Sequence, residues 1–179
     1  MKLVFIYGAP ATGKLTIGRE LAAQTGYKLH HNHMAVDLGL ALFNYEDPNL
    51  VLLCGQIDMC VFKIAAAARL AGLVFTFAYS GPTSDPFIQE VIKTFDSDLY
   101  FVHLSCDVAE LRRRVKSEDR RKYRKVTDPD ILMGTLEGID YTKDIAHYNH
   151  LAIGTTDLPP ANAARQIADY FGLPYSDCT

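Results

Sequence analysis

A glycine-rich stretch that contains one lysine is the part of this sequence best suited to chemistry. It reads Gly8-Ala9-Pro10-Ala11-Thr12-Gly13-Lys14-Leu15-Thr16. Glycines permit backbone conformations that a side chain would forbid, so the N–H groups of such a stretch can converge on one point. The lysine adds a full positive charge beside them. We therefore expect residues 8–16 to bind phosphate groups.

The residues on either side support this expectation. The apolar run Leu3–Tyr7 predicts a buried strand, and Leu15–Gln24 carries apolar residues at helical spacing. A phosphate-binding loop requires the order strand, glycine loop, helix, because the helix points its positive end at the phosphates. We expect Lys14 to reach the outer phosphates of a nucleotide.

A cluster of polar residues follows the second predicted strand, and it includes His33 and Asp37. These two are four residues apart, so they share a face of a helix. Transfer of a phosphoryl group to a hydroxyl needs a residue that orients the acceptor and takes its proton. Asp37 is our first candidate for that base. The alternatives are that His33 is the base or orients Asp37, and that Asp37 is an ordinary exposed carboxylate.

Two further residues are candidates for contact with a substrate. Asp58 lies inside an apolar helical stretch, where a carboxylate is costly unless it is paired, so it is either a substrate contact or the partner of a cation in the fold. A simple solvent-facing position for Asp58 is left open. Tyr79 ends the third apolar strand, where enzymes with such a loop often carry a Mg²⁺-binding aspartate. Asp85 is the nearest acid and is interpreted first as a helix cap before Pro86.

The positive charge is concentrated in one segment. Residues 110–125 hold nine Lys or Arg and three acids, a net charge of +6, so the remainder sums to −9 within a total of −3. Such a run is usually a solvated face. Because it follows the fourth strand, its arginines could also fold over bound phosphates and exclude water. The net negative charge of the rest of the chain argues against a nucleic-acid partner.

Composition and length favour one globular domain over residues 1–179, with 49% hydrophobic residues. The four cysteines have no metal-ligand or disulfide spacing, which favours the reduced thiols of a cytoplasmic protein. The apolar start is too short for a signal peptide. Charged and polar residues interrupt the long apolar helix predicted over 48–70, so we expect no membrane span. The oligomeric state is left open.

Predicted strands and helices alternate along the chain. The strands cover 2–7, 27–31, 73–79, 99–105 and 150–153, and the helices cover 13–25, 32–43, 48–70, 84–95, 107–116, 127–138 and 160–171. This alternation predicts an α/β fold with three α/β/α layers and a five-stranded parallel sheet. Ligands of such sheets bind at the carboxyl ends of the strands.

Leu15 stands where most phosphate-binding loops have a hydroxyl residue that contacts Mg²⁺, and Thr16 is the next hydroxyl. This Gly-Lys-x-Thr arrangement resembles the loop of adenylate kinases. The resemblance implies that Mg²⁺ is held mainly through water and phosphate oxygens, and that Thr16 faces an inner phosphate.

The whole chain resembles the small P-loop kinases, the group of adenylate kinase, shikimate kinase and chloramphenicol phosphotransferase. The resemblance implies an arginine-rich lid over ATP at about 112–127, with Arg114 near adenine. It also implies phosphate contacts from Arg120, Arg121 or Arg124, and an acceptor region after the second strand, which supports Asp37.

The chain is more closely similar to bacterial shikimate-kinase-like (AAA-family) ATP-binding proteins, over residues 31–38, 75–77, 125–129 and 154–156. It departs from shikimate kinase at two places. Asn32 stands where an acid would be expected, and Ser80-Gly81-Pro82 replaces a triple glycine.

The combined prediction is a kinase that uses ATP and Mg²⁺ to phosphorylate a hydroxyl of a small molecule. Lys14, Asp37 and Arg120 are the predicted catalytic residues; His33, Asp37, Asp58 and Tyr79 are the predicted substrate contacts. One alternative is a nucleoside monophosphate kinase. Another is an ATP-binding regulatory protein with little transfer activity, which Leu15 and the missing strand-three aspartate would favour.

Overall fold

Five strands form one parallel sheet in the computed structural model, which describes residues 1–79, 81–117 and 126–175. Their order across the sheet is β2-β3-β1-β4-β5, and every neighbouring pair is parallel. The strands are β1 (Lys2–Gly8), β2 (Lys28–His31), β3 (Gly72–Phe77), β4 (Leu99–Ser105) and β5 (His150–Gly154). The predicted five-stranded parallel sheet is confirmed.

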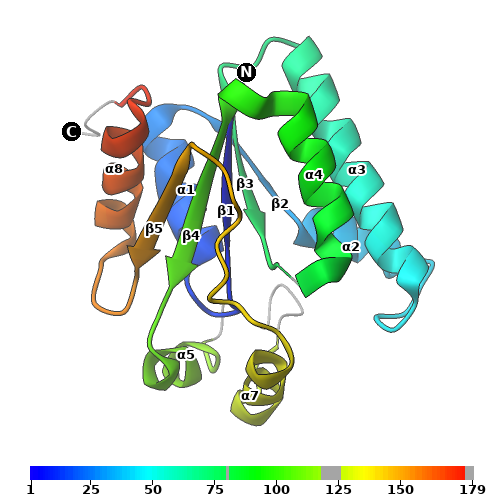
Figure 1. The fold of residues 1–179 in the computed structure, drawn as a ribbon. Coiled ribbons are helices and arrows are strands. Elements are labelled where there is room, and N and C mark those ends of the chain that lie inside the picture. The colour runs from blue at the N-terminus through cyan, green and yellow to red at the C-terminus, as the bar shows by residue number, and fades with distance from the viewer. Residues whose placement is uncertain (80, 118–125, 176–179) are drawn as a thin grey trace.

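Helices cover both faces of this sheet, as Figure 1 shows. They are α1 (Lys14–Thr25), α2 (His33–Gly39), α3 (Pro48–Ala67), α4 (Asp85–Phe95), α5 (Val108–Arg114), α7 (Pro129–Gly138) and α8 (Pro160–Phe171), with short 3₁₀ turns at Gly81–Ser84 and Asp96–Asp98. Helices α1 and α8 pack on one face, and α3 and α4 pack on the other. Helices α5 and α7 lie beyond the carboxyl ends of the strands (Figure 1).

The central strand β1 is apolar from Leu3 to Tyr7 because both of its faces are covered. Val4 and Ile6 face α1 and α8, whereas Leu3, Phe5 and Tyr7 face the side of α3 and α4. Strands β3 and β4 flank it and continue the same two cores. The carboxyl end of β1, which carries the glycine loop, is therefore fixed in the middle of the sheet.

Several element boundaries differ from the prediction by two to four residues, and those of α2 and β3 bear on the site. Helix α2 ends at Gly39 rather than near residue 43, because the chain turns there: the N–H of Leu42 donates to the carbonyl oxygen of Gly39 at 2.9 Å. Gly39 also packs against α3, since a Cβ at this position would lie 2.5 Å from Leu50 Cδ1. Strand β3 ends at Phe77, two residues before Tyr79.

Helix α3 is long and apolar enough to cross a membrane when judged by length and composition alone. One such helix is weak evidence, because the core helix of a globular domain passes the same test. In this fold Asp58, Met59 and Phe62 are buried on its inner side, and Met59 and Phe62 belong to the core on the α3–α4 face of the sheet.

Candidate active site

The loop between β1 and α1 has the backbone geometry of a phosphate cradle. Gly8 has φ +138°, and a Cβ there would lie 2.2 Å from the carbonyl oxygen of Leu104 on β4. Gly13 has φ +95° and caps the start of α1. Both positions therefore require glycine. Ala11 also has a positive φ of 69°, which the sequence did not indicate.

The side chain of Lys14 folds back across this loop. Its Nζ donates to the carbonyl oxygens of Gly8 at 2.9 Å and of Ala9 at 2.7 Å. Thr12 closes the loop from inside, because its buried hydroxyl donates to the Ala9 carbonyl at 2.9 Å. A glycine cradle beside an ammonium group fits the phosphates of a nucleotide.

The loop forms one wall of a cavity of about 920 Å³. The other walls come from the start of α2, the end of β3, the segment around α5 and the start of α7. The lining residues are Pro10, Ala11, Gly13, Lys14, Leu15, Thr16, Arg19, Asn32, His33, Tyr45, Thr76, Ala78, Arg113, Arg114, Lys116, Ser117, Val126, Thr127, Asp128 and Ile131. The cavity therefore joins the predicted phosphate loop, acceptor region and lid base.

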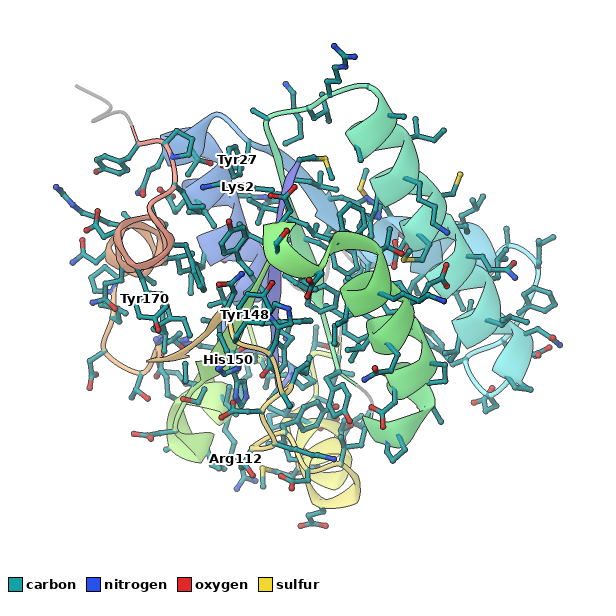
Figure 2. The ribbon with its side chains drawn as sticks, turned by 45° about the horizontal axis from the view of Figure 1, so that its top comes forward. Lys2, Tyr27, Arg112, Tyr148, His150 and Tyr170 are labelled. Carbon is teal, nitrogen blue, oxygen red and sulfur yellow. The ribbon has the colours of Figure 1, made fainter. Side chains whose placement is uncertain are left out.

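The base of the predicted lid is tied together by ion pairs. Arg113 and Arg114 both donate to the carboxylate of Glu110, at 2.6–2.7 Å, and these bonds lower the pKa of Glu110 to about 2. Arg112 reaches across to Asp130 of α7 at 3.5 Å, and Figure 2 shows its side chain in this region. The predicted phosphate contacts Arg120, Arg121 and Arg124 lie outside the described residues.

His33 and Asp37 are placed differently relative to the cavity. His33 is the first residue of α2 and lines the cavity together with Asn32. Asp37 lies one turn further along the same helix, is exposed and is not among the lining residues. The helix face that His33 and Asp37 share therefore contacts the cavity at His33 but not at Asp37.

Asp58 is buried against His30, with Oδ1 2.6 Å from His30 Nε2. Burial raises the pKa of Asp58, although the His30 hydrogen bond lowers it. The His30 ring stacks on Phe75 at 5.4 Å between centroids. Of the two interpretations of Asp58, this geometry favours the partner within the fold, and Asp58 does not line the cavity.

Tyr79 is also buried, and its hydroxyl donates to Asp85 Oδ1 at 2.9 Å. Burial and the Asp85 carboxylate raise the pKa of this phenol. Neither residue lines the cavity, whose lining at this strand end comes from Thr76 and Ala78. Asp85 is the first residue of α4, after its N-cap Ser84.

A cluster of ionisable side chains on the α3–α4 face was not predicted. The Tyr7 hydroxyl lies 2.8 Å from His150 Nε2 and accepts the N–H of Ile145 at 2.8 Å. The Tyr7 ring stacks on His103, which contacts Asp144 at 2.6 Å. Figure 2 shows His150 at the start of β5. The cluster joins residues about 140 positions apart, so local sequence patterns did not reveal it.

Within the parts of the chain that the structure describes, no group of three or more His, Cys, Asp or Glu could hold a metal ion. Thr16 is exposed at the cavity wall. That Mg²⁺ is held mainly through phosphate oxygens and water stays a prediction.

No protein-family model and no curated protein matches the chain. Solved structures match it over nearly its whole length. A sugar kinase from Janibacter sp. HTCC2649 has a TM-score of 0.67 at 13% identity, covering 97% of this chain and 95% of that one. The shikimate kinase from Acinetobacter baumannii, in complex with shikimate, has a TM-score of 0.64 at 18% identity, covering 96% and 93%. A gluconokinase from Sinorhizobium meliloti 1021 has a TM-score of 0.61 at 14% identity, covering 96% and 91%.

These likenesses concern the fold, because structural similarity at such low identity does not transfer an activity. The chain has the fold of the small P-loop kinases, and the predicted fold class is confirmed. The roles of individual residues must be argued from the site itself.

Proposed function

We propose that the protein is an ATP-dependent kinase that transfers the γ-phosphoryl group to a hydroxyl of a small molecule. The observation that carries the proposal is the glycine cradle with Lys14 Nζ folded across it, at the wall of a cavity of about 920 Å³. Neighbours named as gluconokinase, shikimate kinase and sugar kinase support the same reaction class by analogy.

Phosphoryl transfer depends mainly on positioning and on charge stabilisation. In the proposal, the loop N–H groups and Lys14 hold the β- and γ-phosphates, and Thr16 faces an inner phosphate. Mg²⁺, when bound, neutralises phosphate charge through phosphate oxygens and water. Arginines of the lid stabilise the transferring group, with Arg120 as the proposed catalytic one.

The acceptor hydroxyl would lie beside the start of α2. His33 is the better placed candidate base because it lines the cavity, and Asp37 remains a candidate because such contacts often tighten only when substrate binds. Cys54, Cys60 and Cys106 are free thiols, which fits a cytoplasmic location for an enzyme that draws on ATP.

The test follows ATP by ³¹P NMR in the presence of acceptor panels. The panels contain sugars and polyols, hydroxy acids such as shikimate and gluconate, and nucleoside monophosphates. We expect one hydroxyl class to gain phosphate, with turnover about 100-fold lower for Lys14→Ala and unchanged for the control Lys93→Ala, which changes an exposed side chain of α4. His33→Ala and Asp37→Ala, assayed separately, then distinguish the two candidate bases.

Three other outcomes would contradict the proposal in different ways. Transfer to nucleoside monophosphates alone would make the protein a nucleoside monophosphate kinase. Tight ATP binding without transfer to any acceptor would favour an ATP-binding regulatory protein. Absence of ATP binding would reject a nucleotide site at residues 8–16.

A further inference from the structure

Thr155, the residue directly after β5, is almost completely buried beneath the phosphate loop. Its N–H donates to the carbonyl oxygen of Ser105 at 2.8 Å. Its hydroxyl lies 2.9 Å from the same oxygen and 3.0 Å from the carbonyl oxygen of Thr12. Thr155 therefore connects the ends of β4 and β5 to the middle of the loop.

Arg114 approaches Thr155 from the base of the lid. Its Nη2 donates to the carbonyl oxygens of Thr155 at 2.7 Å and Thr156 at 3.1 Å, and its Nη1 donates to the Thr155 hydroxyl at 3.3 Å. Its Nε donates to Glu110 at 2.7 Å. The guanidinium group therefore binds the turn after β5, and because it donates to the hydroxyl, the single hydroxyl proton is left for a carbonyl oxygen. The Ser105 carbonyl already accepts the Thr155 N–H, so the Thr12 carbonyl is the acceptor that depends on this proton.

The bond to Thr12 has a consequence for the next amide. The C=O of Thr12 and the N–H of Gly13 belong to one planar trans peptide, so they point in opposite directions. Because the Thr12 carbonyl points toward buried Thr155, the Gly13 N–H points away from Thr155. Gly13 lines the cavity and Thr155 does not, so this N–H is directed to the side where phosphates would bind.

We propose that Thr155 and Arg114 are positioning residues that fix the Thr12–Gly13 peptide in the phosphate-binding orientation. Thr155 holds the carbonyl, and Arg114 holds Thr155. Arg114 in this arrangement supports the loop through Thr155, in addition to the contact near adenine that its family resemblance implies. The link to catalysis rests on the proposed function, whereas the orientation of the peptide does not.

The experiment compares four variants with the wild-type chain. Thr155→Val keeps the shape and removes the hydroxyl, and Thr155→Ser keeps the hydroxyl. Arg114→Lys keeps the charge but loses the planar donor fork. Thr94→Val is the matched control, because it removes an exposed hydroxyl that donates to the Glu90 carbonyl oxygen within helix α4. The first readout is the ¹⁵N–¹H resonance of Gly13 without nucleotide, and the second is the affinity for ATP.

We expect the Gly13 amide resonance to shift in Thr155→Val and in Arg114→Lys, with ATP affinity about tenfold weaker. Thr155→Ser and Thr94→Val should resemble the wild type. A folded Thr155→Val with an unchanged Gly13 amide would overturn the proposal. If Thr155→Val does not fold, an unchanged Gly13 amide in Arg114→Lys would overturn it instead.

The two readouts separate this inference from the proposed function. If neither the wild type nor any variant binds ATP, the proposed function is wrong. The Gly13 amide resonance still decides in that case whether Thr155 orients the peptide. If ATP binds normally to Thr155→Val although the Gly13 amide has moved, the positioning role in nucleotide binding is wrong.

Discussion

At Gly8 the backbone passes so close to β4 that a single methyl group cannot be added. Two features disfavour any side chain at Gly8: its φ of +138°, and the distance of only 2.2 Å between an added Cβ and the Leu104 carbonyl oxygen. We expect Gly8→Ala to lower the free energy of unfolding by about 3 kcal/mol and to abolish nucleotide binding. Urea denaturation and ATP titration measure the two effects.

Gly134 provides the matched control for this substitution. It lies within helix α7, and a Cβ there would meet nothing within 4 Å. Gly134→Ala should raise the stability by up to about 1 kcal/mol, because alanine favours the helix. Equal losses in the two variants would show that the contact with Leu104 does not restrict Gly8.

The buried pair of Asp58 and His30 gives a second prediction about single residues. The hydrogen bond of 2.6 Å lies in the core, so we expect Asp58→Asn and His30→Gln to lower stability and to be non-additive, with a coupling energy of about 2 kcal/mol. A double-mutant cycle in urea measures it. ATP affinity should stay within about twofold of the wild type; a selective loss of activity toward the acceptor would instead make Asp58 a substrate contact.

The segment between helix α7 and strand β5 is held to the sheet by the cluster of ionisable side chains around Tyr7. Burial raises the pKa of Tyr7, so its phenol keeps its proton, and its hydroxyl lies 2.8 Å from His150 Nε2. Burial also lowers the pKa of His150, so the neutral ring is favoured in the fold. The stability from this group is present above the ordinary histidine pKa of about 6.5 and is lost as the pH falls below it.

Tyr7→Phe tests this contact because it removes the hydroxyl and keeps the ring. We expect a loss of about 1–2 kcal/mol at pH 7.5, since the Ile145 N–H also loses its acceptor. The difference from the wild type should shrink as the pH falls below the ordinary histidine pKa and His150 gains a proton in both proteins. Denaturation at several pH values measures this difference in stability, with Tyr170→Phe at an exposed position as the control. A difference that does not change with pH would mean that His150 does not contribute to it.

The order of the elements could be predicted from local patterns, and the side-chain networks could not. Strand β1, the loop and α1 follow from apolar spacing and two glycines. The pairs Asp58–His30 and Thr155–Thr12 join residues 28 and 143 positions apart, so they depend on the order of strands in the sheet. Asp37 shows the same limit: its spacing from His33 is helical, but only the short length and direction of α2 decide which residue faces the cavity.

For the whole molecule, the proposed site predicts that ligand and stability are linked. A ligand at 100-fold its dissociation constant adds about 2.7 kcal/mol to the free energy of unfolding. For a chain of this size, that corresponds to a rise in Tm of about 5–10 °C. We expect ATP with Mg²⁺ to give this shift in the wild type, as measured by calorimetry, and an acceptor to add a further shift.

Two controls make this shift specific to the phosphate loop. Lys14→Ala should lose it at the same ATP concentration, whereas Lys93→Ala should retain it. Mg²⁺ alone should give no shift, because the described residues contain no cluster of side chains able to hold the ion without a nucleotide. An equal shift in Lys14→Ala would mean that ATP binds elsewhere on the molecule, and a shift with Mg²⁺ alone would mean that the chain holds the metal directly.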